Sequence, residues 1–172
     1  IQMSQSELQR LVEVMDRLRS PGGCAWDAEQ THASLIKYLL EESYEFIDAI
    51  ETEDRAGMRE ELGDVLLQVY FHSRIAQDHP TDPFSIEDVA RAIADKLISR
   101  HPHVFDNLEV SGTEEIIENW EAIKAREKGR TSAIDGIAMS QPALPLVSKI
   151  FYRAEKYGVE LELPAYASEE QV

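Results

Sequence analysis

Residues 39–71, LLEESYEFIDAIETEDRAGMREELGDVLLQVYF, carry two pairs of carboxylates in an otherwise strongly apolar stretch. Glu42 and Glu45 form the first pair, and Glu61 and Asp64 form the second. Apolar residues on both sides of the acidic turn recur every three or four positions, which is the period of an amphipathic α-helix. The stretch therefore predicts two helices, at about 33–50 and 54–77, that fold as an antiparallel hairpin around an apolar seam.

The two carboxylate pairs are expected to face each other at the edge of that seam. On a wheel with about 100° per residue, Glu42 and Glu45 border the apolar stripe, whereas Glu41 points toward solvent. Folding the chain about position 53 places residue 42 opposite 64, and residue 45 opposite 61. We therefore expect Glu42, Glu45, Glu61 and Asp64 at one level beside the core.

Such a cluster requires positive charge, because neighbouring carboxylates raise one another's pKa and burial raises it further. Apart from Arg74 near its far end, the hairpin offers only Lys37, Arg55 and Arg59 as Lys or Arg side chains. A site made of carboxylate oxygens suits Mg²⁺ or Mn²⁺ better than Zn²⁺ or copper. The alternative is a solvated acidic helix face, which the EExxE pattern at 114–118 is expected to form, because no ExxD faces it. The two facing pairs favour the metal site.

Helical patterns also dominate the rest of the chain, and strand patterns are nearly absent. We expect an all-α helical bundle built around the hairpin. Four further helices are predicted. The first follows a cap at Ser4 or Ser6 and ends near Arg19, and the second opens with a Ser85–Asp88 capping box. The third begins with Thr113 as its cap, and the last spans about 144–157. Segments 20–27 and 101–107 are expected to break the helices.

Length, net charge and cysteine content limit the classes of protein to which this chain can belong. The chain has 172 residues and a formal net charge of −16. This length suffices for one domain with a core, and the negative charge disfavours nucleic-acid and membrane partners. Cys24 is the single cysteine, which excludes an internal disulfide framework and indicates a reducing compartment. With no signal-peptide pattern and no long apolar stretch, we expect a cytoplasmic protein.

Three segments together carry a resemblance to a known family. CAWDAEQTHASLIKYLLEESYEFIDAI, EELGDVLLQVYF and KLISRHPHVF resemble MazG, an all-α nucleoside triphosphate pyrophosphohydrolase family, and the likeness spans about 8–158. The resemblance implies Mg²⁺ held by Glu42, Glu45, Glu61 and Asp64, the same four residues that the wheel selects. It also implies cleavage between the α- and β-phosphates, giving a monophosphate and pyrophosphate, and assembly into a homodimer or higher homo-oligomer.

The family pattern further implies residues that bind the nucleotide. Lys96 and Arg100 match its K-x-x-x-R motif, and Trp120 and Lys124 match its W-x-x-x-K motif. Each pair has i,i+4 spacing and so lies on one helix face. Cationic side chains can neutralise phosphate oxygens, and Trp can stack on a base. The alternative is that Lys96 and Arg100 simply complement a helix C-terminus, where we expect both to be exposed.

The reaction implied by the resemblance is metal-assisted hydrolysis, in which water attacks the α-phosphorus. The base that accepts the proton of this water stays open between Glu45 and Glu41. The wheel favours Glu45, or a hydroxide on the metal, over Glu41. We interpret His101 and His103 as turn or cap residues, and Trp26 as a core residue that could instead border the nucleotide pocket.

Two other functions compete with this interpretation. One is a module with the same fold that binds metal and nucleotide but has low activity, as a regulatory part of a tandem MazG protein. The other is a di-iron carboxylate bundle, which needs two Glu-x-x-His motifs; the chain has only Glu29-x-x-His32. We expect a MazG-like domain over 1–130 and a connecting segment over 131–172, packed on the domain or on its dimer partner. The chain is then a single-domain form or the N-terminal half of a tandem form.

Overall fold

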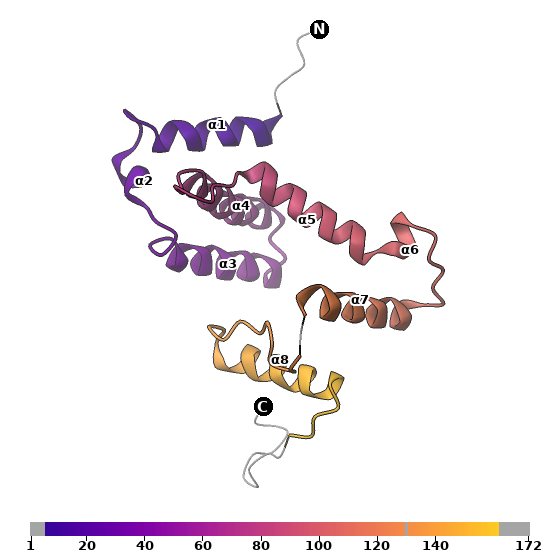
Figure 1. Ribbon diagram of the computed structural model, residues 1–172. Coiled ribbons are helices and arrows are strands. Elements are labelled where there is room, and N and C mark those ends of the chain that lie inside the picture. The colour runs from indigo at the N-terminus through magenta and orange to yellow at the C-terminus, as the bar shows by residue number, and fades with distance from the viewer. Residues whose placement is uncertain (1–5, 130, 162–172) are drawn as a thin grey trace. The chain divides into compact units, whose positions relative to one another are not determined.

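The computed structural model describes residues 6–129 and 131–161, and its regular structure over these residues is helical throughout (Figure 1). The expected all-α class is therefore confirmed. In chain order the helices are α1 (Glu7–Arg19), α2 (Ala25–Glu29), α3 (Ile36–Glu51), α4 (Arg55–Gln77), α5 (Ile86–Arg100), α6 (Pro102–Phe105), α7 (Thr113–Lys128) and α8 (Ala143–Lys156). None of these described helices is both long and apolar enough to cross a membrane.

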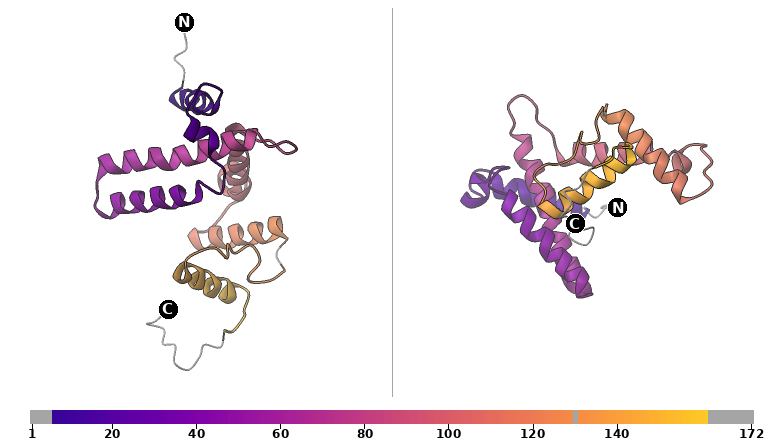
Figure 2. Two further views of the ribbon diagram at one scale, coloured as in Figure 1. Left: turned by 90° about the vertical axis from the view of Figure 1, so that its left-hand side faces the viewer. Right: turned by 90° about the horizontal axis from the view of Figure 1, so that it is seen from below.

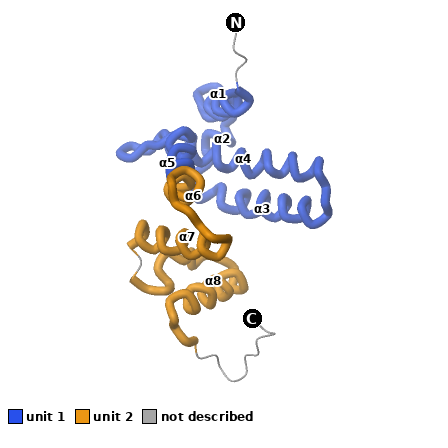
Figure 3. Tube along the Cα trace, turned by 90° about the vertical axis from the view of Figure 1, so that its right-hand side faces the viewer, with its two compact units in different colours: residues 1–95 blue, residues 96–172 orange. Residues whose placement is uncertain are grey.

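The chain forms two compact units, Ile1–Asp95 and Lys96–Val172 (Figure 3). The boundary between the units falls within α5. Helices α1 to α4 and most of α5 belong to the first unit, and α6, α7 and α8 belong to the second. The division expected from the sequence, a domain over 1–130 followed by a connecting segment, stays a prediction.

The first unit is organised around α3 and α4, which lie side by side as the expected antiparallel hairpin (Figures 1 and 2). Three residues connect them. Glu53 adopts a left-handed backbone conformation with φ 55°, and Asp54 caps α4. The Asp54 side chain accepts hydrogen bonds from the backbone nitrogens of Ala56 at 3.0 Å and Gly57 at 3.1 Å. This cap satisfies two of the helix N-H groups that lack an intrahelical partner, and it fixes where α4 begins.

The hydrophobic core of this unit lies at the end of the hairpin away from its turn. Met15 of α1 and Leu35, immediately before α3, are each about 1% exposed, and they pack with Tyr70 and Phe71 of α4. Helix α1 contributes the partly buried Leu11, Val12 and Leu18 to the same cluster. The core therefore anchors the second half of α4, whereas Glu61 and Asp64 lie in its first half.

The apolar stripe predicted for α3 is less buried than expected. Four of its members have 43–56% of their surface exposed: Ile36, Leu40, Ile47 and Ile50. Leu62 of α4 is also 50% exposed. The sequence pattern identifies apolar positions but cannot show what covers them, and within the first unit α1 reaches α4 rather than the outer face of α3.

Two of the three predicted helix caps are present in the structure, and the third lies one residue earlier than expected. Ser6 caps α1, and Ser85 and Asp88 form the expected reciprocal capping box, with a backbone nitrogen-to-side-chain distance of 2.9 Å in one direction and 3.4 Å in the other. Thr113, expected as a cap, is instead the first helical residue of α7, and the N-cap residue is Gly112. Glu115, in the first turn, accepts hydrogen bonds from the backbone nitrogen and hydroxyl of Ser111 at 2.8 and 2.7 Å and so ties the preceding segment to this helix end.

Two short helices occupy segments that were expected only to break longer ones. Helix α2 spans Ala25–Glu29, and α6 begins at Pro102. Proline is compatible with the first turn of a helix, because the backbone N-H that it lacks has no partner there. His101 is the residue before α6, in agreement with its interpretation as a cap residue.

The Asp54 cap yields a stability prediction. Replacing Asp54 with Ala leaves the backbone nitrogens of Ala56 and Gly57 without their side-chain acceptor. We expect Asp54→Ala to lower the free energy of unfolding by about 1 kcal/mol, measured by chemical denaturation. Asp82→Ala, at an exposed loop carboxylate, is the matched control. Equal effects of the two substitutions would show that the cap does not stabilise the hairpin.

Candidate metal centre

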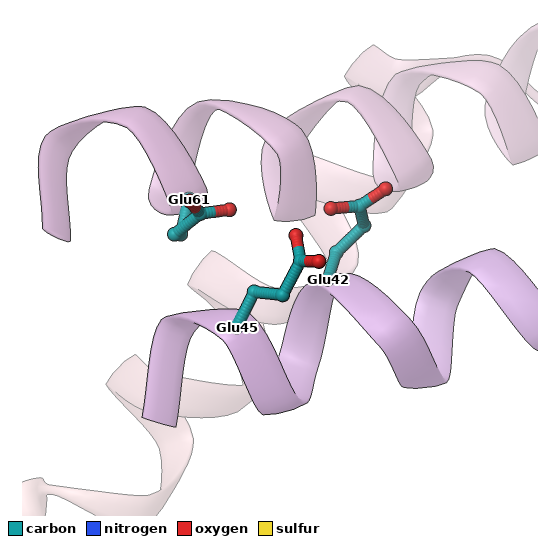
Figure 4. A group of neighbouring side chains, drawn as sticks. All are labelled: Glu42, Glu45 and Glu61. Carbon is teal, nitrogen blue, oxygen red and sulfur yellow. The ribbon is translucent and has the colours of Figure 1, made fainter. Parts of the chain in front are cut away.

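Three carboxylates from the two helices of the hairpin converge between the helices. Glu42 and Glu45 of α3 and Glu61 of α4 each offer one oxygen atom, and these oxygens all lie within 4.8 Å of one another. Figure 4 shows the three side chains directed into the space between α3 and α4. Glu42 and Glu61 are half-buried, and Glu45 is exposed.

The electrostatics reveal how the two helices are aligned. Burial and then the charge of Asp64 raise the pKa of Glu42 above its usual value. Burial and then the charge of Glu45 raise the pKa of Glu61, and a side-chain hydrogen bond between Glu61 and Glu45 adds to this effect. Among the neighbouring carboxylates, Asp64 therefore has the largest effect on the pKa of Glu42, and Glu45 has the largest effect on the pKa of Glu61. This agrees with the alignment expected from the turn.

Asp64 and Glu41 occupy different positions relative to the three converging residues. Asp64 is half-buried and contributes no oxygen to the 4.8 Å group, although its charge acts on both Glu42 and Glu61. Glu41 is exposed and also lies outside the group. The structure therefore separates the adjacent residues Glu41 and Glu42, as the helical wheel predicts.

No basic side chain compensates the cluster within the described part of the chain. Neither Lys37, Arg55 nor Arg59 forms an ion pair there with the carboxylates of the hairpin. The Lys37 ammonium instead lies 4.6 Å from the centroid of the Tyr38 ring. Carboxylate oxygens that converge from two helices with no basic partner are the donor set that a hard divalent cation requires, so the residues fit such an ion.

The second EExxE segment, at 114–118, provides an internal comparison. Glu115 caps α7 by binding Ser111, which lowers the pKa of Glu115. Glu114 and Glu118 are exposed. None of the three belongs to a metal-binding group among the described residues. The expected cap and surface roles of this segment are confirmed, and the motif alone therefore does not define a metal centre.

The candidate nucleotide-binding residues belong to the second unit, where they are partly engaged with one another. Lys96 is exposed, as expected. The expectation that Arg100 is exposed is wrong, because only 8% of its surface is accessible. Its Nε and Nη2 atoms donate hydrogen bonds to Oε2 of Glu127 at 3.1 and 2.7 Å. This contact lowers the pKa of Glu127. A partner 27 residues away cannot be identified from a helix-end pattern.

Trp120 and Lys124 share one face of α7, as their spacing predicts. The Lys124 ammonium lies 3.7 Å from the centroid of the Trp120 ring, which is a cation–π contact, and it also pairs with Glu121 at 3.1 Å. The indole nitrogen of Trp120 is buried with no hydrogen-bond partner among the described residues. The ring of His101 lies 6.3 Å away. The pair therefore forms a half-buried cationic and aromatic surface.

Trp26, interpreted as a core residue, is 49% exposed. Its ring packs edge-to-face against the ring of Tyr38, with the ring centroids 5.8 Å apart, and against the ring of Phe71, with the centroids 6.4 Å apart. It therefore lies at the margin of the core rather than inside it. Sequence patterns do not identify Glu127 as the partner of Arg100. They also do not identify His72 as the partner of His32, because the two residues are 40 positions apart.

Comparison with known proteins places these features in a family. The family model described as the MazG nucleotide pyrophosphohydrolase domain matches residues 30–105, which include all four hairpin carboxylates. The chain is 50% identical over 150 residues to an uncharacterized 26.1 kDa protein of Streptomyces cacaoi. It is 47% identical over 152 residues to a nucleoside triphosphate pyrophosphohydrolase of Mycobacterium tuberculosis. It is 46% identical over 158 residues to a nucleoside triphosphate pyrophosphohydrolase/pyrophosphatase MazG of Thermotoga maritima.

These alignments cover 87%, 88% and 91% of the chain, respectively. They cover 61%, 46% and 60% of the three relatives. The chain therefore spans less than two thirds of the length of each of these curated relatives.

The raised pKa of Glu42 predicts how stability changes with pH in the metal-free protein. A carboxyl group whose pKa is raised by folding stabilises the fold while it is protonated, and this contribution is lost as pH rises through the folded-state pKa. We expect Glu42→Gln to raise the melting temperature at pH 7.5 in the presence of chelator, and the gain to shrink as pH falls toward 4.5, the usual pKa of Glu. Glu114→Gln, at an exposed carboxylate of α7, is the matched control.

Added Mg²⁺ should reverse this ranking. An ion that binds only the folded state stabilises it by about 2.7 kcal/mol at a hundredfold excess over Kd. We expect most of this gain to be absent from Glu42→Gln and retained in Glu114→Gln. Thermal unfolding with Mg²⁺ is compared with NaCl at the same ionic strength. A gain that NaCl reproduces, or that both variants retain, would contradict a metal centre at the hairpin.

Proposed function

Because this chain belongs to the MazG family, we propose that it hydrolyses ribo- and deoxyribonucleoside triphosphates to a monophosphate and pyrophosphate. The observation that carries the proposal is the convergence of Glu42, Glu45 and Glu61 across the hairpin, inside the segment that matches the family. The relatives from Mycobacterium tuberculosis and Thermotoga maritima bear names for this reaction. Such an activity removes nucleotides from the cellular pool and therefore suits a housecleaning enzyme of the cytoplasm.

The metal cofactor that we propose is Mg²⁺, with Mn²⁺ as a substitute. Glu42, Glu45 and Glu61 would hold it, and Asp64, whose charge acts on the same site, would be the fourth carboxylate. When bound, the ion supplies positive charge opposite the triphosphate and makes a neighbouring water more acidic.

In the proposed reaction a water oxygen attacks the α-phosphorus. The bond from this phosphorus to the oxygen bridging to the β-phosphorus breaks, and pyrophosphate leaves with the bonding electron pair. Glu45 accepts the proton of the attacking water. Glu45 suits this role better than Glu41, because it belongs to the converging group and Glu41 does not.

The second unit supplies candidates for binding the nucleotide. Lys96 has an exposed ammonium that can approach phosphate oxygens. Arg100 has its guanidinium oriented by Glu127, and Lys124 covers one face of Trp120. We propose that Lys96, Arg100 and Lys124 contact phosphates and that Trp120 stacks on the base. Stacking tolerates any base, so base selectivity would be modest.

We also propose that the protein works as a homodimer or a higher homo-oligomer. The support is the row of half-exposed apolar side chains on α3, which includes Ile36, Leu40, Ile47 and Ile50. Contiguous apolar surface of this kind marks an interaction site more often than a solvated face. The net charge of −16 disfavours nucleic acid as the partner.

One observation favours the alternative of a low-activity regulatory module. Arg100 is engaged by Glu127, and Lys124 by Trp120 and Glu121. A module that keeps these contacts would bind metal and nucleotide without efficient phosphate handling. The two functions differ in turnover but not in metal binding.

Turnover is tested with a pyrophosphate-coupled assay on the purified chain with Mg²⁺. Glu42→Gln removes a proposed metal ligand, and we expect it to lower kcat/KM at least about 100-fold, the upper range for residues that merely support a metal ligand. Its neighbour Glu41→Gln is the matched control and should lose much less. Glu61→Gln serves as the blank.

Three outcomes would change the proposal. Equal losses at 41 and 42 would show that the ligands are wrongly assigned. Activity no higher than the Glu61→Gln blank, with nucleotide binding intact, would support the regulatory module. Release of orthophosphate in place of pyrophosphate would indicate attack at the γ-phosphorus and contradict the proposed reaction.

Lys96 and Arg100 should respond differently to truncation. Lys96→Ala removes an exposed charge, so we expect a higher KM for triphosphate and an unchanged melting temperature. Arg100→Ala also breaks the hydrogen bonds to Glu127, which should lower the free energy of unfolding by about 1.5–3 kcal/mol. Calorimetry of both variants, with Glu127→Gln as a third, measures this. A melting temperature unaffected by Arg100→Ala would show that the buried pair does not stabilise the unit.

A further inference from the structure

His32 and His72 form a contact away from the carboxylates. Their Nδ1 atoms are 2.7 Å apart, the rings are parallel to within 4°, and the ring centroids are 5.1 Å apart. Centroids can be this far apart at so short a nitrogen–nitrogen distance only if both nitrogens lie on the line that joins the centroids. The two parallel rings therefore share one plane and meet edge to edge rather than face to face. The contact is an in-plane N-H···N hydrogen bond.

Only one of the two facing nitrogens can carry a proton in this bond. Nε2 of His72 is buried and has no hydrogen-bond partner among the described residues, whereas His32 is exposed. A buried N-H without an acceptor is disfavoured, so His72 carries its proton on Nδ1 and donates it to His32. His32 then carries its own proton on Nε2, where water can accept it.

The position of this bond in the fold gives it a structural role. His32 lies in the segment that leads into α3, and His72 lies on α4 beside the core residue Phe71. The turn capped by Asp54 joins one end of the hairpin, and the histidine pair joins the other. The four carboxylates lie between these two ends. The histidine bond therefore restrains the hairpin from sliding or splaying at the end that no turn closes.

The surroundings offer no counterion for a doubly charged pair. The elements packed around the pair carry charged and titratable side chains that include Asp16 and Arg19 of α1, Asp27 and Glu29 of α2, Lys37, Tyr38 and Glu42 of α3, and Asp64, Tyr70, Arg74 and Asp78 at α4 or its end. Among the described residues, no carboxylate pairs with either imidazole. Arg19, which donates to the backbone oxygen of Gln30 at 3.3 Å, adds positive charge nearby.

We propose that the His32–His72 hydrogen bond is a pH-sensitive clasp on the open end of the α3–α4 hairpin, closed while both imidazoles are neutral and opened by acid. A proton added to Nδ1 of His32 removes the acceptor and turns two N-H groups toward each other. A proton added to Nε2 of His72 places a charge in a buried position.

The linkage between protonation and stability follows from this geometry. Burial, and then the neighbouring His32 ring, lower the pKa of His72. A histidine whose pKa is lowered by folding stabilises the fold while it is neutral. That contribution is fully present above the unfolded-state pKa of about 6.5, and it is lost as pH falls through the folded-state value.

Two substitutions at the exposed histidine separate the hydrogen bond from its titration. His32→Asn places an amide near the former Nδ1 position, so it can keep a bond to His72 but cannot titrate. His32→Ala removes the bond at every pH. The matched control is His79→Asn, because Nδ1 of the exposed loop residue His79 accepts from the backbone nitrogen of Asp82 at 3.0 Å. All four proteins are melted in the absence of metal between pH 7.5 and 5.5.

We expect His32→Ala to melt about 2–4 °C below the wild type at pH 7.5, and this gap to close at pH 5.5. His32→Asn should melt close to the wild type at pH 7.5 and above it at pH 5.5. His79→Asn should follow the wild-type profile. A gap for His32→Ala that is the same at both pH values, or a His32→Asn profile that parallels the wild type, would overturn the clasp.

Nitrogen NMR of the imidazoles provides a second readout that does not depend on stability. The closed clasp requires His72 in the Nδ1-H form, His32 in the Nε2-H form, and a His72 pKa below the ordinary histidine value of about 6.5. Both histidines in the Nε2-H form at neutral pH, or a His72 pKa at the ordinary histidine value, would contradict the hydrogen bond itself.

Discussion

Electrostatic repulsion among Glu42, Glu45 and Glu61 is the constraint that the α3–α4 hairpin imposes on the first unit of this protein. The turn between α3 and α4 fixes the alignment that brings these carboxylates together, and no basic side chain among the described residues offsets them. Burial, and then the charges of the neighbouring carboxylates, raise the pKa of Glu42 and of Glu61 and so disfavour their ionisation. A divalent cation removes this penalty, and for this reason the same residues that weaken the metal-free fold are suited to bind metal.

The stability that tolerates such a cluster comes from other parts of the hairpin. Met15 and Leu35 are buried at the far end, where α1 packs on the second half of α4. Asp54 fixes the turn, and the ion pairs of Arg74 with Asp16 and Asp78, at 3.0 and 2.8 Å, join α1 to the end of α4. Core and metal centre are thus separated along the helices, so the carboxylates remain partly accessible while the backbone that carries them is held at both ends.

Local sequence was sufficient to predict the features that depend on neighbours in the chain. The alignment of 42 with 64 and of 45 with 61 follows from helix periodicity and the position of one short turn, and the Ser85–Asp88 capping box follows from spacing alone. Features that depend on distant partners could not be predicted. The burial of Arg100 requires Glu127, and the bond of His32 requires His72, which lies on another helix.

Exposure was the least predictable property, for a related reason. Periodicity shows which side chains are apolar and share a helix face, but burial depends on what packs against that face. Ile36 and Leu40 of α3 and Trp26 of α2 are each about half exposed for this reason. Thr113 differs from its expected capping role because α7 begins at Thr113 itself, so the residue before it, Gly112, occupies the N-cap position.

Paramagnetic broadening by Mn²⁺ tests the metal centre most directly. Substoichiometric Mn²⁺ is added to the isotopically labelled protein, and the loss of each backbone amide signal is recorded. A site formed by the hairpin carboxylates predicts that the signals of residues 42, 45, 61 and 64 vanish first, while those of the second EExxE segment, at 114–118, persist. Broadening that affects residues 114–118 equally, or that spreads over the acidic surface without a focus, would contradict a metal centre between α3 and α4.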